Sequence, residues 1–396
     1  MRILISAGEA SGEMYGAQLI HSLRAQFAVE AKVHPIEFFG VGGPQMHAAG
    51  CDIVVNAQDL SVVGITEILN HLPKIWGLFH RLIAEADRRK PDLAIVIDSP
   101  AFNWRVARQM KKRGVPVVYY VCPQFWAWRQ GRVRLLRKYV DKALVIFPFE
   151  EKFYRDRGVD AEFVGHPLAD LARPVSSREE YAAQYGIDAS KRWITLMPGS
   201  RRKEVKMNLP GIVQSAEALG NEFEFLLPVA PTLTSEFVRS HISKAPRRAP
   251  EFANVHFVPE ALPALAFSRA GIIASGTATV EAAMMELPFV MVYRVTPLTY
   301  LLGRSTVKVP HFAMVNLIAG EEVVPELVQD DFTPENVASG LKEIIPDGLA
   351  REKMLSGLRR VKSLLRRQAD SSLHPADRAA RTILLLPAVV RLSENR

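Results

Sequence analysis

Short apolar segments alternate with amphipathic segments along most of the 396 residues, and this alternation restricts the possible fold more than any other feature. In the first half, the apolar segments lie at 2–8, 36–43, 92–100, 115–123 and 142–150, with helical patterns near 12–25, 44–49 and 103–113. In the second half, they lie at 193–200, 223–230, 255–260, 270–277 and 288–294, with helical patterns near 208–220 and 278–286. Such alternation predicts an α/β fold of doubly wound parallel sheets with helices on both faces.

A polar stretch rich in proline and serine interrupts the alternation near 165–190, and we expect a domain boundary there. Beyond residue 335 the chain has a basic, helical pattern. We therefore expect two Rossmann-like domains, at 1–170 and 171–345, and C-terminal helices at 346–396. Doubly wound sheets bind ligands beyond the carboxyl ends of their strands, so we expect a ligand cleft where the two domains face each other.

Composition excludes several classes of protein. The formal net charge of +8 is a moderate excess that suits nucleic acid, anionic lipid or a phosphorylated substrate, or only a basic surface. Cys51 and Cys122 lie far apart, which excludes a disulfide scaffold and a zinc–cysteine site and fits a reducing compartment. The sequence shows no run of about 18 apolar residues and no signal-peptide core, so we expect a cytoplasmic protein.

The loop after the first apolar segment, "AGEASGEMYGAQLI" at 7–20, has the glycines of a nucleotide-binding loop but the wrong charges for phosphate. It holds Glu9 and Glu13 and no lysine or arginine, and its glycine spacing is too short for a P-loop. We expect its glycines to allow a tight turn and the close approach of a sugar.

Two loops in the second half resemble anion-binding sites. In "LMPGSRRKEV" a turn leads to Arg201, and in "IIASGTATVEAA" Ser275, Gly276 and Thr277 begin a helix. Free N–H groups and the dipole of a helix start suit a diphosphate, and Glu281, one turn further, suits a ribose diol. The alternative is ordinary helix capping, with Glu281 on a solvated face.

Asp98 ends the apolar segment "AIVID", where a carboxylate suits a general base. The alternative is a helix cap. His166 fits a structural role better than a catalytic one. No metal-ligand spacing stands out, so we expect chemistry without a metal or another cofactor. Trp126 and Trp128 precede several arginines and could stack on bases, but packing is the commoner role, and we expect no nucleic-acid partner.

A broad apolar stripe at helical spacing lies within 62–83, edged by basic residues. The residues of the stripe are Ile65, Ile68, Leu69, Leu72, Ile75, Trp76, Phe79, Leu82 and Ile83. The pattern suits an anionic membrane surface or acyl chains, and the alternative is a core helix. We expect Pro73 and Gly77 to interrupt the helix.

Taken together, the motifs make the chain similar to the lipid A disaccharide synthase family. The members of this family are glycosyltransferases of the GT-B type, with two Rossmann-like domains. The matching stretches include "AGEASGEMYGAQLI", "GVGGPQM", "DLSVVGITEIL", "VIDSPAFN", "FVGHPLAD", "LMPGSRRKEV", "SGTATVEAA" and "NLIAG", in family order. The resemblance implies that UDP-2,3-diacylglucosamine and 2,3-diacylglucosamine 1-phosphate (lipid X) react, with inversion, to a β-1,6 disaccharide 1-phosphate and UDP. A UDP-sugar 2-epimerase or another GT-B nucleotide-sugar enzyme is the alternative.

The same resemblance implies roles for individual residues. The general base would be Asp98, with Glu9, Gly8, Ser11 and Gly12 facing the acceptor. The UDP-sugar would be bound by Arg201, Ser275, Gly276, Thr277, Glu281 and Asn316. The membrane or the acyl chains would be met by Ile65, Ile68, Leu69, Leu72 and Trp76. It also implies work at the inner face of the cytoplasmic membrane and a homodimer, with C-terminal helices that cross back to the first domain or exchange between subunits. Three positions depart from the family pattern: Glu13, Ala101 and Val315.

Overall fold

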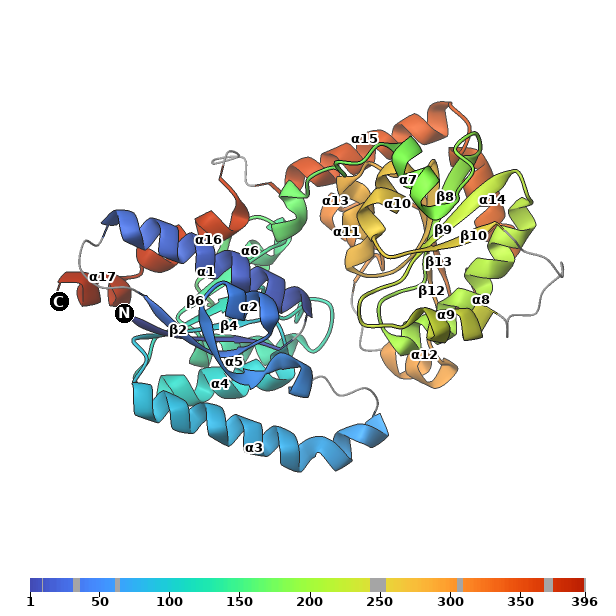
Figure 1. Cartoon of the computed structure of the whole chain (residues 1–396). Coiled ribbons are helices and arrows are strands. Elements are labelled where there is room, and N and C mark those ends of the chain that lie inside the picture. The colour runs from blue at the N-terminus through green and yellow to red at the C-terminus, as the bar shows by residue number, and fades with distance from the viewer. Residues whose placement is uncertain are drawn as a thin grey trace. The chain divides into compact units, whose positions relative to one another are not determined.

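The computed structural model describes residues 1–8, 10–30, 36–60, 65–242, 254–304, 309–366 and 373–394 (Figure 1). The chain forms two compact units, one of residues 1–167 with 365–396 and one of residues 168–364. The boundary falls within the expected polar stretch. The C-terminal helices divide differently from our expectation, because α15 (Leu349–Leu364) belongs to the second unit and only the chain after it returns to the first.

The first unit is built on a seven-stranded parallel sheet of order β3-β2-β1-β4-β5-β6-β7. Its strands are β1 (Arg2–Ala7), β2 (Glu37–Gly42), β3 (Cys51–Asn56), β4 (Leu93–Ile97), β5 (Val117–Tyr120), β6 (Lys142–Val145) and β7 (Ala161–Phe163). Every residue of β4 and β5 is buried, as expected for strands covered on both faces. The order reverses between β1 and β4, and ligands of such sheets bind at that switch point.

Helices cover both faces of this sheet (Figure 1). The helices of this unit are α1 (Ala10–Glu30), α2 (Pro44–Ala48), α3 (Ile65–Arg89), α4 (Pro100–Lys112), α5 (Val133–Tyr139), α6 (Pro148–Arg155), α16 (Pro375–Leu384) and α17 (Pro387–Glu394). Phe79 of α3, Val106 of α4 and Leu136 of α5 share one core with the sheet. Helix α16 packs along α1, where Gln26 Nε2 donates to the carbonyl of Asp377 at 2.8 Å.

The second unit has a six-stranded parallel sheet of order β10-β9-β8-β11-β12-β13. Its strands are β8 (Arg192–Met197), β9 (Phe223–Pro228), β10 (Val255–Val258), β11 (Ala270–Ala274), β12 (Phe289–Tyr293) and β13 (Glu326–Val328). Its helices before α15 are α7 (Arg178–Tyr185), α8 (Arg202–Leu219), α9 (Ser235–Ile242), α10 (Ala261–Phe267), α11 (Thr277–Met284), α12 (Pro297–Arg304), α13 (Met314–Ala319) and α14 (Pro334–Ile344). Its strand order reverses between β8 and β11.

Helix α3 contradicts one expectation. It runs unbroken from Ile65 to Arg89, so Pro73 and Gly77 do not interrupt it. Pro73 lies on the exposed side of the helix, and the packing of Phe79, Leu82 and Ile83 against the sheet outweighs the cost of a proline inside the helix. Cys51 and Cys122 are buried free thiols. Among the described helices, none is long and apolar enough to cross a membrane.

Candidate active site

Asp98 follows β4 directly, at the switch point of the first sheet, and it is partly buried. Asp98 and Ser99 both have left-handed backbone conformations, with φ of +47° and +46°. The left-handed conformation costs a non-glycine residue about 1–2 kcal/mol, so the surrounding structure must hold it. The N-cap of α4 is Ser99 rather than Asp98, so the helix-cap alternative does not describe Asp98.

Two side chains hold the carbonyl group of Asp98. The Tyr119 hydroxyl donates to it at 2.7 Å, and the Asn103 amide donates to it at 2.9 Å. The Asp98 N–H in turn donates to the Tyr120 carbonyl at 3.2 Å. Backbone strain that is fixed so thoroughly is found mainly at functional sites, which supports Asp98 as a functional residue.

Asn103 is fully buried and joins the ends of β1 and β4. Its Nδ2 also donates to the carbonyls of Ile97 at 2.8 Å and Ser6 at 3.1 Å, and its Oδ1 accepts from the Ser6 hydroxyl at 2.7 Å. From the sequence we assigned no role to Asn103 or Tyr119. The available sequence signal for Asn103 was an amide side chain on the apolar face of the predicted helix.

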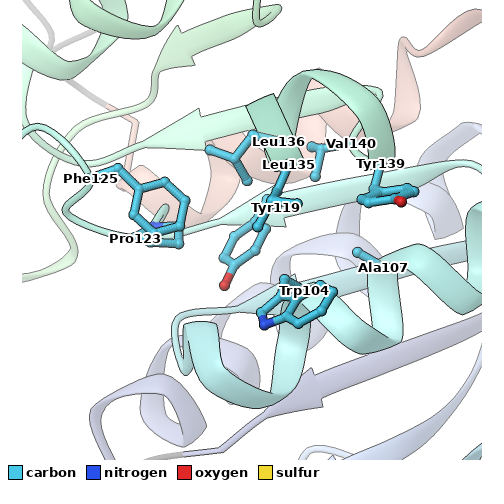
Figure 2. Close-up of a pocket in the computed structure, with 9 residues that line it drawn as sticks. All are labelled: Trp104, Ala107, Tyr119, Pro123, Phe125, Leu135, Leu136, Tyr139 and Val140. Atoms are coloured by element: carbon cyan, nitrogen blue, oxygen red, sulfur yellow. The ribbon is translucent and has the colours of Figure 1, made fainter. Parts of the chain in front are cut away.

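Tyr119 lies against a small apolar cavity of about 10 Å³, room for roughly one water molecule. Figure 2 shows its ring between Phe125 and Pro123 on one side and Trp104 on the other, with the hydroxyl at the end of α4 that carries Trp104. Burial raises the pKa of Tyr119 well above its ordinary value. The hydroxyl therefore remains protonated and keeps its role as a donor to Asp98.

The glycine-rich loop lies against the turn of Asp98 and Ser99. A methyl group on Gly8 would stand 2.4 Å from Ser99 Oγ, so the close approach allowed by Gly8 is to Ser99, where we had expected a sugar. A methyl group on Gly12 would have ordinary space, 3.7 Å from Ala7 Cβ, and Ser11 is exposed. Glu9, our second candidate for catalysis, lies outside the described residues.

Glu13 has a structural role at the start of α2. Its Oε1 accepts a hydrogen bond from the Gln45 N–H at 2.8 Å, and a methyl group on Gly43 would lie 2.6 Å from both carboxylate oxygens. A carboxylate at a helix start is favoured by the free N–H groups there. The negative charge at position 13 is therefore explained without any ligand.

The tryptophan-containing loop after β5 is anchored rather than open for base stacking. Trp126 is buried, and its Nε1 donates to Glu150 Oε1 at 2.8 Å. Burial raises the pKa of Glu150 to about 7, although hydrogen bonds from Trp126, Phe147 and Ile146 oppose that rise. Trp128 is 45% exposed, with the Arg129 guanidinium stacked 4.4 Å from its ring centre.

In the second unit, the loop from Ser275 to Thr277 presents an open helix start. Gly276 is the N-cap of α11 with φ of +142°. Apart from its two neighbours in the chain, no residue that the structure describes has an atom within 4 Å of the position that a methyl group would occupy there. Thr277 is exposed, whereas the Ser275 hydroxyl donates to the Phe312 carbonyl at 2.8 Å. Glu281 is partly buried, and burial raises its pKa to about 7.

The loop before α8 is occupied by a carboxylate of the protein itself. Glu204 Oε2 accepts from the N–H groups of Ser200 at 3.0 Å and Arg201 at 3.2 Å. Glu204 Oε1 lies 3.0 Å from Arg201 Nη1 in an ion pair, and the Arg201 side chain is 70% exposed. The backbone donors that we expected to bind an anion here are thus engaged by Glu204.

Asn316 is fully buried, and all its hydrogen-bonding atoms are used within the protein. Its Nδ2 donates to the Val324 carbonyl at 2.9 Å and to Glu326 Oε1 at 2.8 Å, and its Oδ1 accepts from the N–H groups of Val323 and Val324. Glu326 in turn accepts from the Phe312 N–H at 2.8 Å. Asn316 therefore supports the segment that braces Ser275.

The apolar stripe of α3 lies in two different environments. Phe79, Leu82 and Ile83 are buried in the core, so this part of the stripe follows the core-helix alternative. Trp76 is 57% exposed and stacks on Phe79 with ring centres 5.7 Å apart. The side chains of Ile65, Ile68, Leu69 and Leu72 lie outside the described part of the structure.

Within the described ranges, no group of three or more histidine, cysteine, aspartate or glutamate side chains is arranged to hold a metal ion.

Comparison with known proteins places these features in a family. A family model described as lipid-A-disaccharide synthetase matches residues 3–379. A lipid-A-disaccharide synthase of Koribacter versatilis is 50% identical over 97% of this chain and 98% of its own. One of Acidobacterium capsulatum is 46% identical over 96% of each chain.

Similar solved structures share the fold at low sequence identity. The calicheamicin glycosyltransferase CalG4 is 15% identical, with a TM-score of 0.59 over 100% of this chain and 98% of its own. MurG of Acinetobacter baumannii is 12% identical, with a TM-score of 0.56 over 97% and 99%. A UDP-GlcNAc 2-epimerase of Neisseria meningitidis bound to UDP-GlcNAc is 12% identical, with a TM-score of 0.61 over 97% and 98%. These likenesses, with the two parallel sheets, confirm the GT-B fold, and at this identity they show the fold alone.

Proposed function

The chain belongs to the lipid-A-disaccharide synthetase family, and from this premise we propose how its residues carry out the transfer. The enzyme is a glycosyltransferase of lipid A biosynthesis that joins UDP-2,3-diacylglucosamine to 2,3-diacylglucosamine 1-phosphate. The products are the β-1,6-linked tetraacyl disaccharide 1-phosphate and UDP. The epimerase alternative is not favoured, because the epimerases share only the fold.

Asp98 is the general base of this reaction in our proposal, and its fixed left-handed turn is the observation that carries the assignment. Its carboxylate accepts the proton of the acceptor 6-hydroxyl as that oxygen bonds to the anomeric carbon of the donor. The bond from the anomeric carbon to the diphosphate breaks, and UDP leaves with the electron pair. Attack from the side opposite the leaving group inverts the anomeric carbon.

The diphosphate binds at the start of α11, where Gly276 leaves the backbone open and the first N–H groups of the helix are available. Glu281 accepts hydrogen bonds from the ribose hydroxyls. Arg201 leaves its ion pair with Glu204 and stabilises the leaving diphosphate instead. An exposed ion pair contributes only about 0–1 kcal/mol, so the exchange costs little.

We also propose that α3 contacts the inner face of the cytoplasmic membrane through Trp76 and the apolar residues that precede it. An exposed tryptophan beside cationic side chains suits the lipid interface, and both substrates of the reaction carry acyl chains. A homodimer remains a second proposal, in which α16 could pack on α1 of either subunit.

The assignment of Asp98 is tested with the two acylated glucosamine substrates and no added metal. Asp98→Asn should abolish disaccharide formation while UDP affinity is unchanged. Asparagine tolerates the left-handed conformation and has the same shape, so the variant removes the charge and keeps the turn. Turnover close to the wild-type rate would refute the assignment. Incubation with UDP-GlcNAc alone should give no N-acetylmannosamine.

A further inference from the structure

The second unit has a basic pocket at the amino ends of its strands, away from the loops described above. The pocket has a volume of about 370 Å³, within the size range of small-molecule sites. It is lined by Arg178, Ala189, Ser190, Lys191, Arg192, Trp193, Phe267, Ser268, Arg269 and Arg351. We call this set the amino-end basic pocket. Its five cations come from α7, from the start of β8, from the residue before β11 and from α15.

Two of the five cations are neutralised by carboxylates. Lys191 Nζ lies 2.9 Å from Glu224 Oε1, and Arg269 pairs with Asp347. The other three, Arg178, Arg192 and Arg351, form no ion pair within the described part of the chain. The pocket therefore carries an excess of positive charge.

The protein holds two of these three guanidinium groups in place through backbone carbonyls. Arg351 is buried and donates to the carbonyls of Ile344 at 2.8 Å and Arg269 at 2.9 Å. Arg178 donates to the carbonyls of Ala189 and Lys191 and stacks 4.0 Å from the centre of the Trp193 ring. Carbonyl acceptors fix the orientation of a guanidinium group without neutralising its charge, and Asp347 and Glu352 oppose only part of the charge near Arg351.

Like charges gathered in one pocket are costly unless an anion joins them. Burial, Arg269 and Arg192 lower the pKa of Arg351, although the carboxylates of Asp347 and Glu352 oppose this shift. The Arg192 side chain is exposed and has no hydrogen-bond partner among the residues that the structure describes. Guanidinium groups match the geometry of phosphate oxygens, so a phosphate group suits the excess positive charge of this pocket.

We propose that the amino-end basic pocket binds a phosphate-bearing ligand at a site separate from the UDP site. Arg269 precedes β11 and Ser275 follows it, and five strand residues span about 16 Å, so one diphosphate cannot occupy both places. The ligand is either a soluble phosphorylated metabolite or the headgroup of an anionic phospholipid. The proposal does not depend on the identity of the reaction.

The test measures pyrophosphate binding by calorimetry to the full-length protein in saturating UDP, which keeps the nucleotide site filled. Wild-type protein should bind pyrophosphate, and Arg192→Glu should weaken that binding at least tenfold. Arg173→Glu is the matched control, because Arg173 is an exposed arginine of the same unit outside the pocket, and it should bind as wild type. Both variants should keep the wild-type affinity for UDP and the wild-type turnover.

A second arm separates the two sources of phosphate. If the ligand is a headgroup, Arg192→Glu should bind phosphatidylglycerol vesicles more weakly in sedimentation than wild type and Arg173→Glu do, while the proposed contact of α3 remains. If the ligand is soluble, the two variants should bind these vesicles equally. Failure of wild-type protein to bind pyrophosphate would overturn the proposal. Equal weakening by Arg192→Glu and Arg173→Glu would overturn it as well, since that result reflects net charge alone.

Discussion

A methyl group on Gly8 would lie 2.4 Å from the hydroxyl oxygen of Ser99, so the first glycine of the chain and the residue after Asp98 are fitted against each other. The contact joins the loop after β1 to the turn after β4, on either side of the switch point. The position of the proposed base Asp98 therefore depends on Gly8, which has no side chain.

Gly8→Ala should displace this turn. Overpacking of a tight contact costs about 1–3 kcal/mol, and we expect turnover to fall at least tenfold with UDP affinity unchanged. The double variant Gly8→Ala with Ser99→Gly removes the obstructing hydroxyl and suits the left-handed backbone, so it should recover most of the turnover. Steady-state kinetics and denaturant unfolding measure both effects. A single variant with normal turnover, or a double variant no better than the single, would contradict the expectation.

Tyr119→Phe removes one of the two donors to the Asp98 carbonyl. We expect a loss of about 1 kcal/mol in the free energy of unfolding and a lower kcat with little change in KM. Tyr139→Phe is the control, because Tyr139 lines the same cavity. If the two variants had the same kcat, the hydrogen bond to Asp98 would have no part in positioning the base.

The raised pKa of Glu281 makes two quantities depend on pH. Folding raises the pKa from about 4.5 to about 7, so the folded state holds the proton more tightly and loses stability as the pH rises from 4.5 to 7. At pH 8 the free energy of unfolding of Glu281→Gln should therefore exceed that of wild type by about 1–3 kcal/mol. At pH 4 the two free energies should be about equal.

The affinity for UDP should change with pH in the opposite direction from the stability. A ribose diol donates to the ionised carboxylate, so wild-type affinity should rise relative to that of Glu281→Gln as the pH passes from 6 to 8. Because both proteins bind the same nucleotide, the titration of UDP itself cancels in the ratio of their dissociation constants. A constant ratio across this range would show that Glu281 does not meet the ribose.

Trp76→Ser should weaken binding to anionic vesicles severalfold and leave turnover on detergent-dispersed substrates unchanged. Trp128→Ser is matched to it, since Trp128 is also an exposed tryptophan of the first unit but lies outside α3. Co-sedimentation with vesicles gives the comparison. Unchanged binding by Trp76→Ser would remove α3 from the proposed membrane contact.

Much of the fold follows from local pattern, because apolar runs with turn residues at their ends mark buried parallel strands. The position of Asp98 could be predicted for the same reason, since the end of a strand is visible in the sequence. The hydrogen bond between Ser6 and Asn103 could not, because it joins residues 97 positions apart and arises only when β1 and β4 pair.

Local pattern could not decide between two physical solutions for two short segments. The turn before Arg201 has the composition of an anion site, and the structure fills it with Glu204 from the next turn of helix. Pro73 predicted a break in α3, but packing of Phe79, Leu82 and Ile83 against the sheet stabilises a continuous helix. In both cases tertiary contacts decided between local alternatives.

Because α16 belongs to the first unit, the two units are completed in the reverse of the order in which their synthesis begins. Residues 168–364 form an uninterrupted unit, whereas the unit of residues 1–167 also needs residues from 365 onward. The Arg378 Nε, in a nearly inaccessible side chain, donates at 2.7 Å to the carbonyl of Val164, the residue after β7. This buried hydrogen bond can form only after α16 has left the ribosome. The unit that is translated first is thus the last to be completed, because the entire second unit is synthesised before α16 can pack on α1.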